Sequence, residues 1–332
     1  MVETIQWSSR DIFTFMAIAA VPTTLHAVFD ITWVSLPWLP IALIGTAVAF
    51  LIGFKNNASY DRMWEARKIW GAIVNRSRSW GLLTRDFVNN DHALEPLSDE
   101  ALREIHQRLI YRHFAWLAAL RHQLRVPKVW EMASRPQHQA WAERVHPHME
   151  RPHEIEDAIR PYISEQEHRY IISKTNFATQ LISNQSRDIK ELKQKGLIED
   201  FRHMEMQAML TEMYTQQGKC ERIKNFPFPR QYATINLFCV WLFVLLVPFG
   251  LVKEFAKGGD VLVWATIPFN AMVCWVFVIM EKIGEISQDP FQNGANDIPM
   301  TTMSHGIEVD LREMLDETEM PEAIVVQNNI VL

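Results

Sequence analysis

Charged residues are nearly absent from three stretches of this 332-residue chain, residues 12–54, 235–252 and 261–280. Residues 261–280 are twenty in number and carry no charge. A helix of that length crosses about 30 Å of hydrocarbon. Residues 237–252 reach the same length once residues 232–236 are added. The short charged turn KEFAKGGD joins these two runs, so they predict a transmembrane hairpin. Two buried core helices of a soluble protein are the alternative.

The amino-terminal apolar run is interrupted by prolines. Residues 12–34 contain Pro22, residues 35–40 (SLPWLP) break the run, and residues 41–54 resume it. Because proline ends or opens a helix, this pattern predicts two helices joined by a proline-rich turn. The second run has only fourteen residues before Lys55, which is short for a helix that faces lipid. Its helical periodicity continues to residue 88, so we expect one long helix that leaves the membrane.

The distribution of lysine and arginine predicts the orientation in the membrane. Residues 55–88 carry seven of these basic side chains, whereas the turn at 34–40 carries none. Positive charge gathers on the cytoplasmic side of membrane proteins. We therefore expect four crossings per chain, both termini in the cytoplasm and a location in the cell membrane, the inner membrane if the protein is bacterial. The amino-terminal run has acidic as well as basic flanks and no small-residue cleavage site, so it does not read as a signal peptide.

The middle of the chain is polar and reads as helical. Apolar residues recur every three or four positions over 98–125, which predicts an amphipathic helix, and residues 165–217 predict one or two more. Residues 126–165 are polar and broken by prolines. Pro227 and Pro229 then mark the return to the membrane.

Composition and motifs narrow the possible functions. A net charge of −6 disfavours nucleic acid as a partner. No nucleotide-binding or hydrolase motif is present, so the sequence does not predict an enzyme or a cofactor. Three cysteines without paired spacing predict neither a disulfide framework nor a zinc site. Four histidines between 126 and 165 lack the spacing of metal ligands and read as a solvated surface; they are His138, His146, His148 and His153.

The stretch GTAVAFLIGF, residues 45–54, carries the clearest candidate for function. Thr46, Phe50 and Phe54 are four residues apart and share one helix face. Ala47, Ala49 and Gly53 between them are small, which permits close approach of neighbouring helices. Rings of Thr and Phe from several subunits would form a hydrophobic constriction that gates a pore by wetting. Ordinary packing of a phenylalanine stripe in a core is the alternative.

Four motifs give the chain a family resemblance. They are GFKNNASYDRMWEARKIWG (53–71), YRHFAWLAALRHQLR (111–125), CERIKNFPFPRQY (220–232) and DPFQNGANDIPM (289–300). In this order they resemble the bacterial branch of the bestrophin family. The resemblance implies an all-α membrane protein that conducts small monovalent ions as a homopentamer around one axial pore. Each subunit would give four transmembrane helices and a helical cytoplasmic domain.

The resemblance also implies a division of the chain and a set of pore residues. The first two transmembrane helices with their cytoplasmic extension would occupy residues 1–88, a helical cytoplasmic region 89–231, a transmembrane hairpin 232–282 and a cytoplasmic C-terminal segment 283–332. By alignment on the Gly53-Phe54 pair, the neck of such channels falls on Thr46, Phe50 and Phe54. A second, cytosolic aperture falls on Phe201.

Two departures from the family pattern concern calcium and the neck. Animal bestrophins bind calcium with an acidic run after Pro-Phe, whereas residues 292–297 (QNGAND) hold one carboxylate. Calcium prefers several charged oxygens, so we expect no calcium requirement and no cofactor. A weak divalent-cation site of backbone and amide oxygens near Asp297 stays open as an alternative. Thr46 supplies a hydroxyl where the family usually has an aliphatic side chain, which would make the entrance easier to wet.

Two other classes of function stay open at this point. His26 and Asp30 lie four apart in the first apolar run, where ionisable groups often serve a transporter or a membrane-bound enzyme; a position at the outer interface is the simpler explanation. The polar middle could also act as a membrane-anchored scaffold. The predicted constrictions are uncharged, so they leave the choice between anions and cations undecided.

Overall fold

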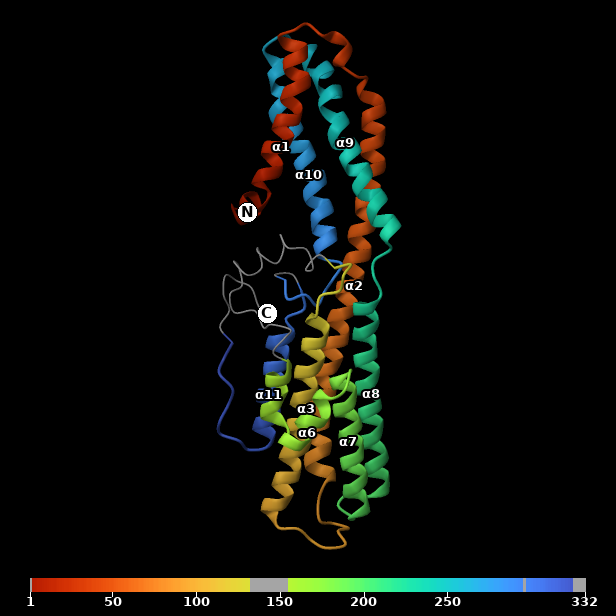
Figure 1. The fold of residues 1–332 in the computed structure, drawn as a ribbon, viewed down its shortest axis with the longest axis vertical. Coiled ribbons are helices and arrows are strands. Elements are labelled where there is room, and N and C mark those ends of the chain that lie inside the picture. The colour runs from red at the N-terminus through yellow and green to blue at the C-terminus, as the bar shows by residue number, and fades with distance from the viewer. Residues whose placement is uncertain (1, 132–154, 295–296, 325–332) are drawn as a thin grey trace. The chain divides into compact units, whose positions relative to one another are not determined.

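The computed structural model describes residues 2–131, 155–294 and 297–324 (Figure 1). This part of the chain is helical and contains no strand, as the sequence predicts. It divides into two compact units, which we call the first unit (residues 1–61 and 228–288) and the second unit (residues 62–227 and 289–332). Helix α2, Trp38–Phe87, contributes to both units as one continuous helix of 50 residues, which confirms the expected long helix.

The first unit is a bundle of apolar helices. Helix α1 lies beside α9 and α10, and the start of α2 completes the bundle (Figure 1). Its core contains Phe15 from α1, Ile41 and Val48 from α2, Val244 from α9 and Cys274 from α10. The helices have these bounds: α1, Val2–Ala27; α9, Arg230–Ala256; η5, Leu262–Ala265; α10, Thr266–Ile286.

Three helical stretches within the described residues are long and apolar enough to cross a membrane. They are Thr32–Phe87, Gln231–Ala256 and Leu262–Ile286. The last two confirm the predicted hairpin as two helices, and the first contains the run at 41–54. Helix α1 does not meet the same standard of length and apolarity. It carries Arg10 and Asp11, and the Asp11 carboxylate pairs with the Lys282 ammonium at 2.6 Å.

The connection between α1 and α2 differs in detail from the prediction. Helix α1 ends at Ala27, and a short 3₁₀ turn, η1 (Thr32–Val34), precedes α2. Helix α2 begins at Trp38, inside the stretch expected to be a turn. Pro40 is compatible with this position because the first turn of a helix has no internal partner for its N–H groups. The turn is held to α9 by a hydrogen bond from the Leu36 N–H to the Phe249 carbonyl oxygen, 3.0 Å long.

The second unit packs α3, α7, α8 and α11 around the end of α2, with three shorter helical segments. Helix α3 confirms the amphipathic helix predicted over 98–125, and the Ser98 side chain caps its first turn. The bounds are α3, Asp99–Arg125; α5, Ile155–Ile159; η4, Arg160–Tyr162; α6, Glu165–Ile172; α7, Phe177–Gln194; α8, Asp200–Asn225; α11, Met300–Met314.

The stretch 165–217 contains three helices instead of the expected one or two. Asn176 caps the start of α7 by accepting a hydrogen bond from the Thr179 N–H, 3.0 Å long. Gly196 separates α7 from α8 with a φ of +74°, a conformation that favours glycine. A side chain at this position would also place its Cβ 2.2 Å from the carbonyl oxygen of His92. These caps are local signals that helical periodicity alone does not resolve.

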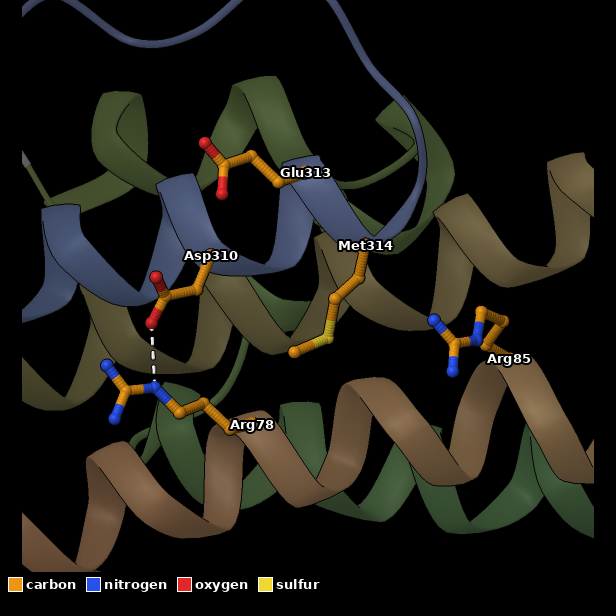
Figure 2. A pocket seen from close by; sticks show the side chains of 5 residues that line it. All are labelled: Arg78, Arg85, Asp310, Glu313 and Met314. Carbon is orange, nitrogen blue, oxygen red and sulfur yellow. Dashed lines mark hydrogen bonds and ion pairs between the residues drawn. The ribbon is translucent and has the colours of Figure 1, made fainter.

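Helix α11 packs closely on α2 within the second unit. A Cβ at Gly81 of α2 would lie 2.5 Å from Leu311 Cδ2 and 2.8 Å from Met314 Sδ of α11, so glycine permits the contact. A hollow of about 480 Å³ lies beside this contact. It is lined by Arg78 and Arg85 of α2 and by three residues of α11, Asp310, Glu313 and Met314, which Figure 2 labels. Nε of Arg78 donates to Asp310 across it at 2.7 Å, so opposite charges already compensate each other there.

The core of the second unit contains a buried imidazole. His113 of α3 is fully buried, and its Nε2 lies 2.8 Å from the Oγ of Ser77 on α2. Burial lowers the pKa of His113 from 6.5 to about 3. The unfolded chain therefore binds a proton at this residue that the folded chain does not bind between those two values.

We expect acid to destabilise the second unit through His113. The stability that neutral His113 contributes is complete above pH 6.5 and declines as the pH falls toward 3. Between pH 6.5 and 5 the loss should be about 2 kcal/mol for this one group. Thermal unfolding at both pH values, for wild type and His113→Gln, measures it. The variant should lose less stability on acidification than wild type. Exposed His92, changed to Gln, is the control and should leave the acid loss unchanged; equal losses in wild type and His113→Gln would contradict the expectation.

Candidate functional site

The three residues predicted to form a pore neck lie together on an open face of α2. Within the first unit, Thr46, Phe50 and Phe54 are all exposed. Phe50 is 67% exposed and Phe54 is 60% exposed. The two rings lie 5.9 Å apart between centroids at an angle of 46°. The Thr46 hydroxyl donates to the Ala42 carbonyl oxygen at 3.0 Å, so the helix itself satisfies one of its polar contacts.

The opposite face of α2 is the one that packs inside the first unit. Ile41, Val48 and Ile52 are buried there. A Cβ at Gly45 would lie 2.6 Å from a ring carbon of Phe243 on α9, so the two helices are in close contact at this glycine. Among the described residues of the first unit, the phenylalanine stripe is therefore not part of the core. A Cβ at Gly53, on the open side, would meet no described atom within 4 Å, as expected of a surface left for a neighbour.

Phe201, the predicted aperture residue, lies in the second unit at the start of α8. Its side chain is 78% exposed. The Glu199 carboxylate caps this helix by accepting from the N–H of Phe201 at 3.2 Å and of Arg202 at 3.4 Å. The cap fixes the backbone at the start of α8, while the ring of Phe201 stays exposed to solvent. Its role as an aperture stays a prediction.

A buried ion pair anchors α2 one residue beyond Phe54. The Lys55 ammonium donates to the Glu281 carboxylate of α10, and the side chains are only 2% and 4% exposed. The Asn236 amide of α9 donates to the same carboxylate. One turn further, the Ser59 hydroxyl donates to the Gly284 carbonyl oxygen at 2.9 Å. Sequence reasoning treated Lys55 only as the end of an apolar run; the signal it passed over was a matching Glu281 at the end of another.

The segment that follows α10 was the candidate for a calcium site. In the second unit, the Asp297 carboxylate accepts from the Gly294 N–H at 2.8 Å, and desolvation raises the pKa of Asp297 to about 6. Burial raises the pKa of Asp289 to about 7, with the nearby Glu131 carboxylate adding to the effect. The Lys224 ammonium pairs with Glu131 at 2.7 Å, so a basic side chain already supplies positive charge here.

Within the described ranges, no group of three His, Cys, Asp or Glu side chains is placed to hold a metal ion. The absence of a calcium requirement stays a prediction. His138, His146, His148 and His153 lie outside the described residues, so the structure adds nothing to their interpretation. Asp30 lies beyond the end of α1, with a φ of +52°, in the turn that leads to α2. It therefore does not share a helix with His26.

An all-helical chain with three stretches long and apolar enough to span a bilayer is a membrane protein of the helical class. Residues 4–313 match the family described as bacterial/fungal bestrophin proteins. The chain belongs to this family, which confirms the resemblance carried by its four motifs.

Curated relatives and solved structures agree with this assignment. The chain is 29% identical over 309 residues to the voltage-dependent anion channel-forming protein RSc3414 of Ralstonia nicotianae, covering 93% of this chain and 87% of the relative. It is 26% identical over 324 residues to the voltage-dependent anion channel-forming protein YneE of Escherichia coli K12, covering 96% of this chain and 90% of the relative. A crystal structure of a bacterial bestrophin homolog from Klebsiella pneumoniae superposes with a TM-score of 0.75 at 23% identity, covering 93% of this chain and 98% of that one. This likeness confirms the fold.

We expect the removal of one partner of the Lys55–Glu281 pair to destabilise the first unit strongly. Glu281→Gln leaves a buried ammonium without its anion, and breaking such a pair costs about 3–5 kcal/mol. The double variant Lys55→Met with Glu281→Met removes both charges and should recover a large part of the loss. Thermal unfolding of the detergent-solubilised protein measures both.

The exposed pair of Lys68 and Glu65, 2.8 Å apart, is the matched control. Glu65→Gln should change stability by less than about 1 kcal/mol, because surface ion pairs contribute little. If Glu281→Gln proves as mild as Glu65→Gln, the buried pair does not hold the helices together.

Proposed function

We propose that this chain is one subunit of a passive ion channel of the bestrophin type, a homopentamer that conducts small monovalent ions through one axial pore. The observation that carries the proposal is the open face of α2. Two phenylalanine rings and a threonine project from it in one line, away from the core of their own unit. The family assignment and the names of the relatives, which describe anion channel-forming proteins, support the same function.

The proposed topology places four helices in the cell membrane. Three are those that meet the length and apolarity standard, and α1 is the fourth. Five neighbouring subunits would shield the start of α2 from lipid, which accounts for its short apolar run. Both termini and the second unit would lie in the cytoplasm, in agreement with the basic residues that follow the first apolar stretch of α2.

The proposed mechanism relies on dehydration at two apolar constrictions. Thr46, Phe50 and Phe54 would each contribute one ring per pentamer to the neck, and Phe201 would contribute the cytosolic aperture. An ion that enters an apolar constriction must shed water, and an unpaired charge in such surroundings is unfavourable. Wetting of the neck would therefore control conduction.

Single-channel recording from purified protein in a lipid bilayer tests the function itself. Discrete conductance steps support a channel. Flux without steps would support a transporter, and the absence of flux would support a membrane-anchored scaffold built on the second unit.

We expect the double variant Phe50→Ala with Phe54→Ala to conduct more than wild type. Smaller side chains widen and wet the neck, so unitary conductance or open probability should rise. Because these rings are exposed in the subunit, their truncation removes few packing contacts, and the assembly should persist. Thr46→Ala should change less, because its side chain is already small and partly polar. Bilayer recording compares the three proteins.

Light scattering on the same preparations provides the control. Wild type and the double variant should both have the mass of five 38.7 kDa subunits. A monomeric wild type would exclude the axial pore, and an intact pentamer with unchanged currents would exclude these residues as its neck. Loss of the pentamer in the double variant would show that the two rings pack in a core, where truncating each phenylalanine costs roughly 3–5 kcal/mol of stability.

A further inference from the structure

The exposed stripe of α2 continues beyond Phe54 with polar residues. Asn57 and Asp61 follow at intervals of three and four, which keeps them on the face of Phe50 and Phe54. Both are exposed in the first unit. The stripe therefore passes from an uncharged apolar segment to a carboxylate within two helical turns.

Two basic residues next to the stripe bind groups other than Asp61. Lys55 is buried against Glu281. Arg62, which follows Asp61 but belongs to the second unit, donates to the carbonyl oxygen of Phe226 at 2.7 Å and to that of Ile223. The Asp61 carboxylate, by contrast, has no ion pair or hydrogen bond with a described residue of its own unit. Along α2 within the first unit, it is the first charged residue after Phe54 for which no ion pair or hydrogen bond joins it to another described residue.

We propose that Asp61 determines the charge selectivity of the channel, favouring monovalent cations over anions; this rests on the proposed function. In a pentamer, five Asp61 carboxylates form a ring at the cytoplasmic mouth of the neck. Rings of acidic side chains select cations in channels because they raise the local cation concentration and repel anions. The apolar neck itself excludes ions by dehydration, which acts on both signs of charge, so the nearest uncompensated charge supplies the discrimination.

The position of the ring makes its effect depend on ionic strength. Exposed charges act over a Debye length of about 10 Å at 0.1 M salt and about 3 Å at 1 M. Two helical turns span about 11 Å, so Asp61 influences the end of the neck at Phe54 most strongly in dilute salt. The preference for cations should therefore weaken as the salt concentration rises. The relatives carry names that describe anion channels. A preference for cations would distinguish this chain from channels of that description.

Reversal potentials in a potassium chloride gradient test the proposal. Wild type should favour potassium over chloride, and Asp61→Asn should lower the permeability ratio at least about threefold. Asp61→Lys should reverse the preference to chloride. Asp260, exposed in the turn between α9 and α10, offers a control of equal charge away from α2. Asp260→Asn should leave the ratio unchanged.

A second variant keeps the test decisive if Asp61 variants fail to assemble by light scattering. Asn57→Lys leaves Asp61 in place, adds a positive charge one turn away on the same stripe, and should also lower the ratio. The proposal is overturned if wild type prefers chloride, or if an assembled, conducting Asp61→Asn or Asn57→Lys keeps the wild-type ratio. A wild type without any single-channel steps would instead contradict the proposed function.

Discussion

The packing of the first unit depends on the contrast between the two faces of helix α2, one buried and the other exposed. One face of α2 closes on α9 and α10 through buried aliphatic residues and a glycine that admits the ring of Phe243. The other face carries Phe50 and Phe54 in the open. Large apolar side chains in a row are unfavourable in water and mark a surface that something else covers or confines. In the proposed pentamer, that surface would face the pore axis and the neighbouring subunits.

The buried Lys55–Glu281 pair lies on the inward side of α2, together with the apolar residues that pack there. A lysine next to Phe54 would be expected to point into a water-filled path, where its charge is well solvated. Instead, it donates to Glu281 of α10, which also accepts from Asn236 of α9, and these contacts hold the rotation of α2 about its axis at the end of the proposed neck. The pair thus contributes specificity of arrangement more than net stability, because two desolvated charges offset much of their own attraction. The same rotation leaves Thr46, Phe50 and Phe54 free to face outward, and it removes a positive charge from the neighbourhood of Asp61.

Features that repeat along the chain could be predicted from the sequence, whereas contacts between distant segments could not be predicted from it. Uncharged runs predicted α9 and α10, and continued periodicity predicted the length of α2. The four-residue spacing predicted that Thr46, Phe50 and Phe54 share a face. The end of α1 at Ala27 and the breaks around α7 depended on turns and caps, which periodicity does not contain. The Lys55–Glu281 pair was missed, because 226 residues separate its members and each resembles the ordinary end of a membrane span. Phe201 was located by resemblance, and its exposure agrees with that role without testing it.

The most direct test of an axial pore lined by α2 is the accessibility of a single thiol at Phe54 to a charged methanethiosulfonate reagent added in water. Phe54→Cys is made in a background with Cys239 changed to Ala, since Cys220 and Cys274 are buried. Phe238→Cys provides a control on α9, at a ring that is 67% exposed but does not lie on the stripe. Such a pore predicts that modification at residue 54 reduces the single-channel current while modification at residue 238 leaves it unchanged. A current that responds at residue 238 and not at residue 54 would contradict it.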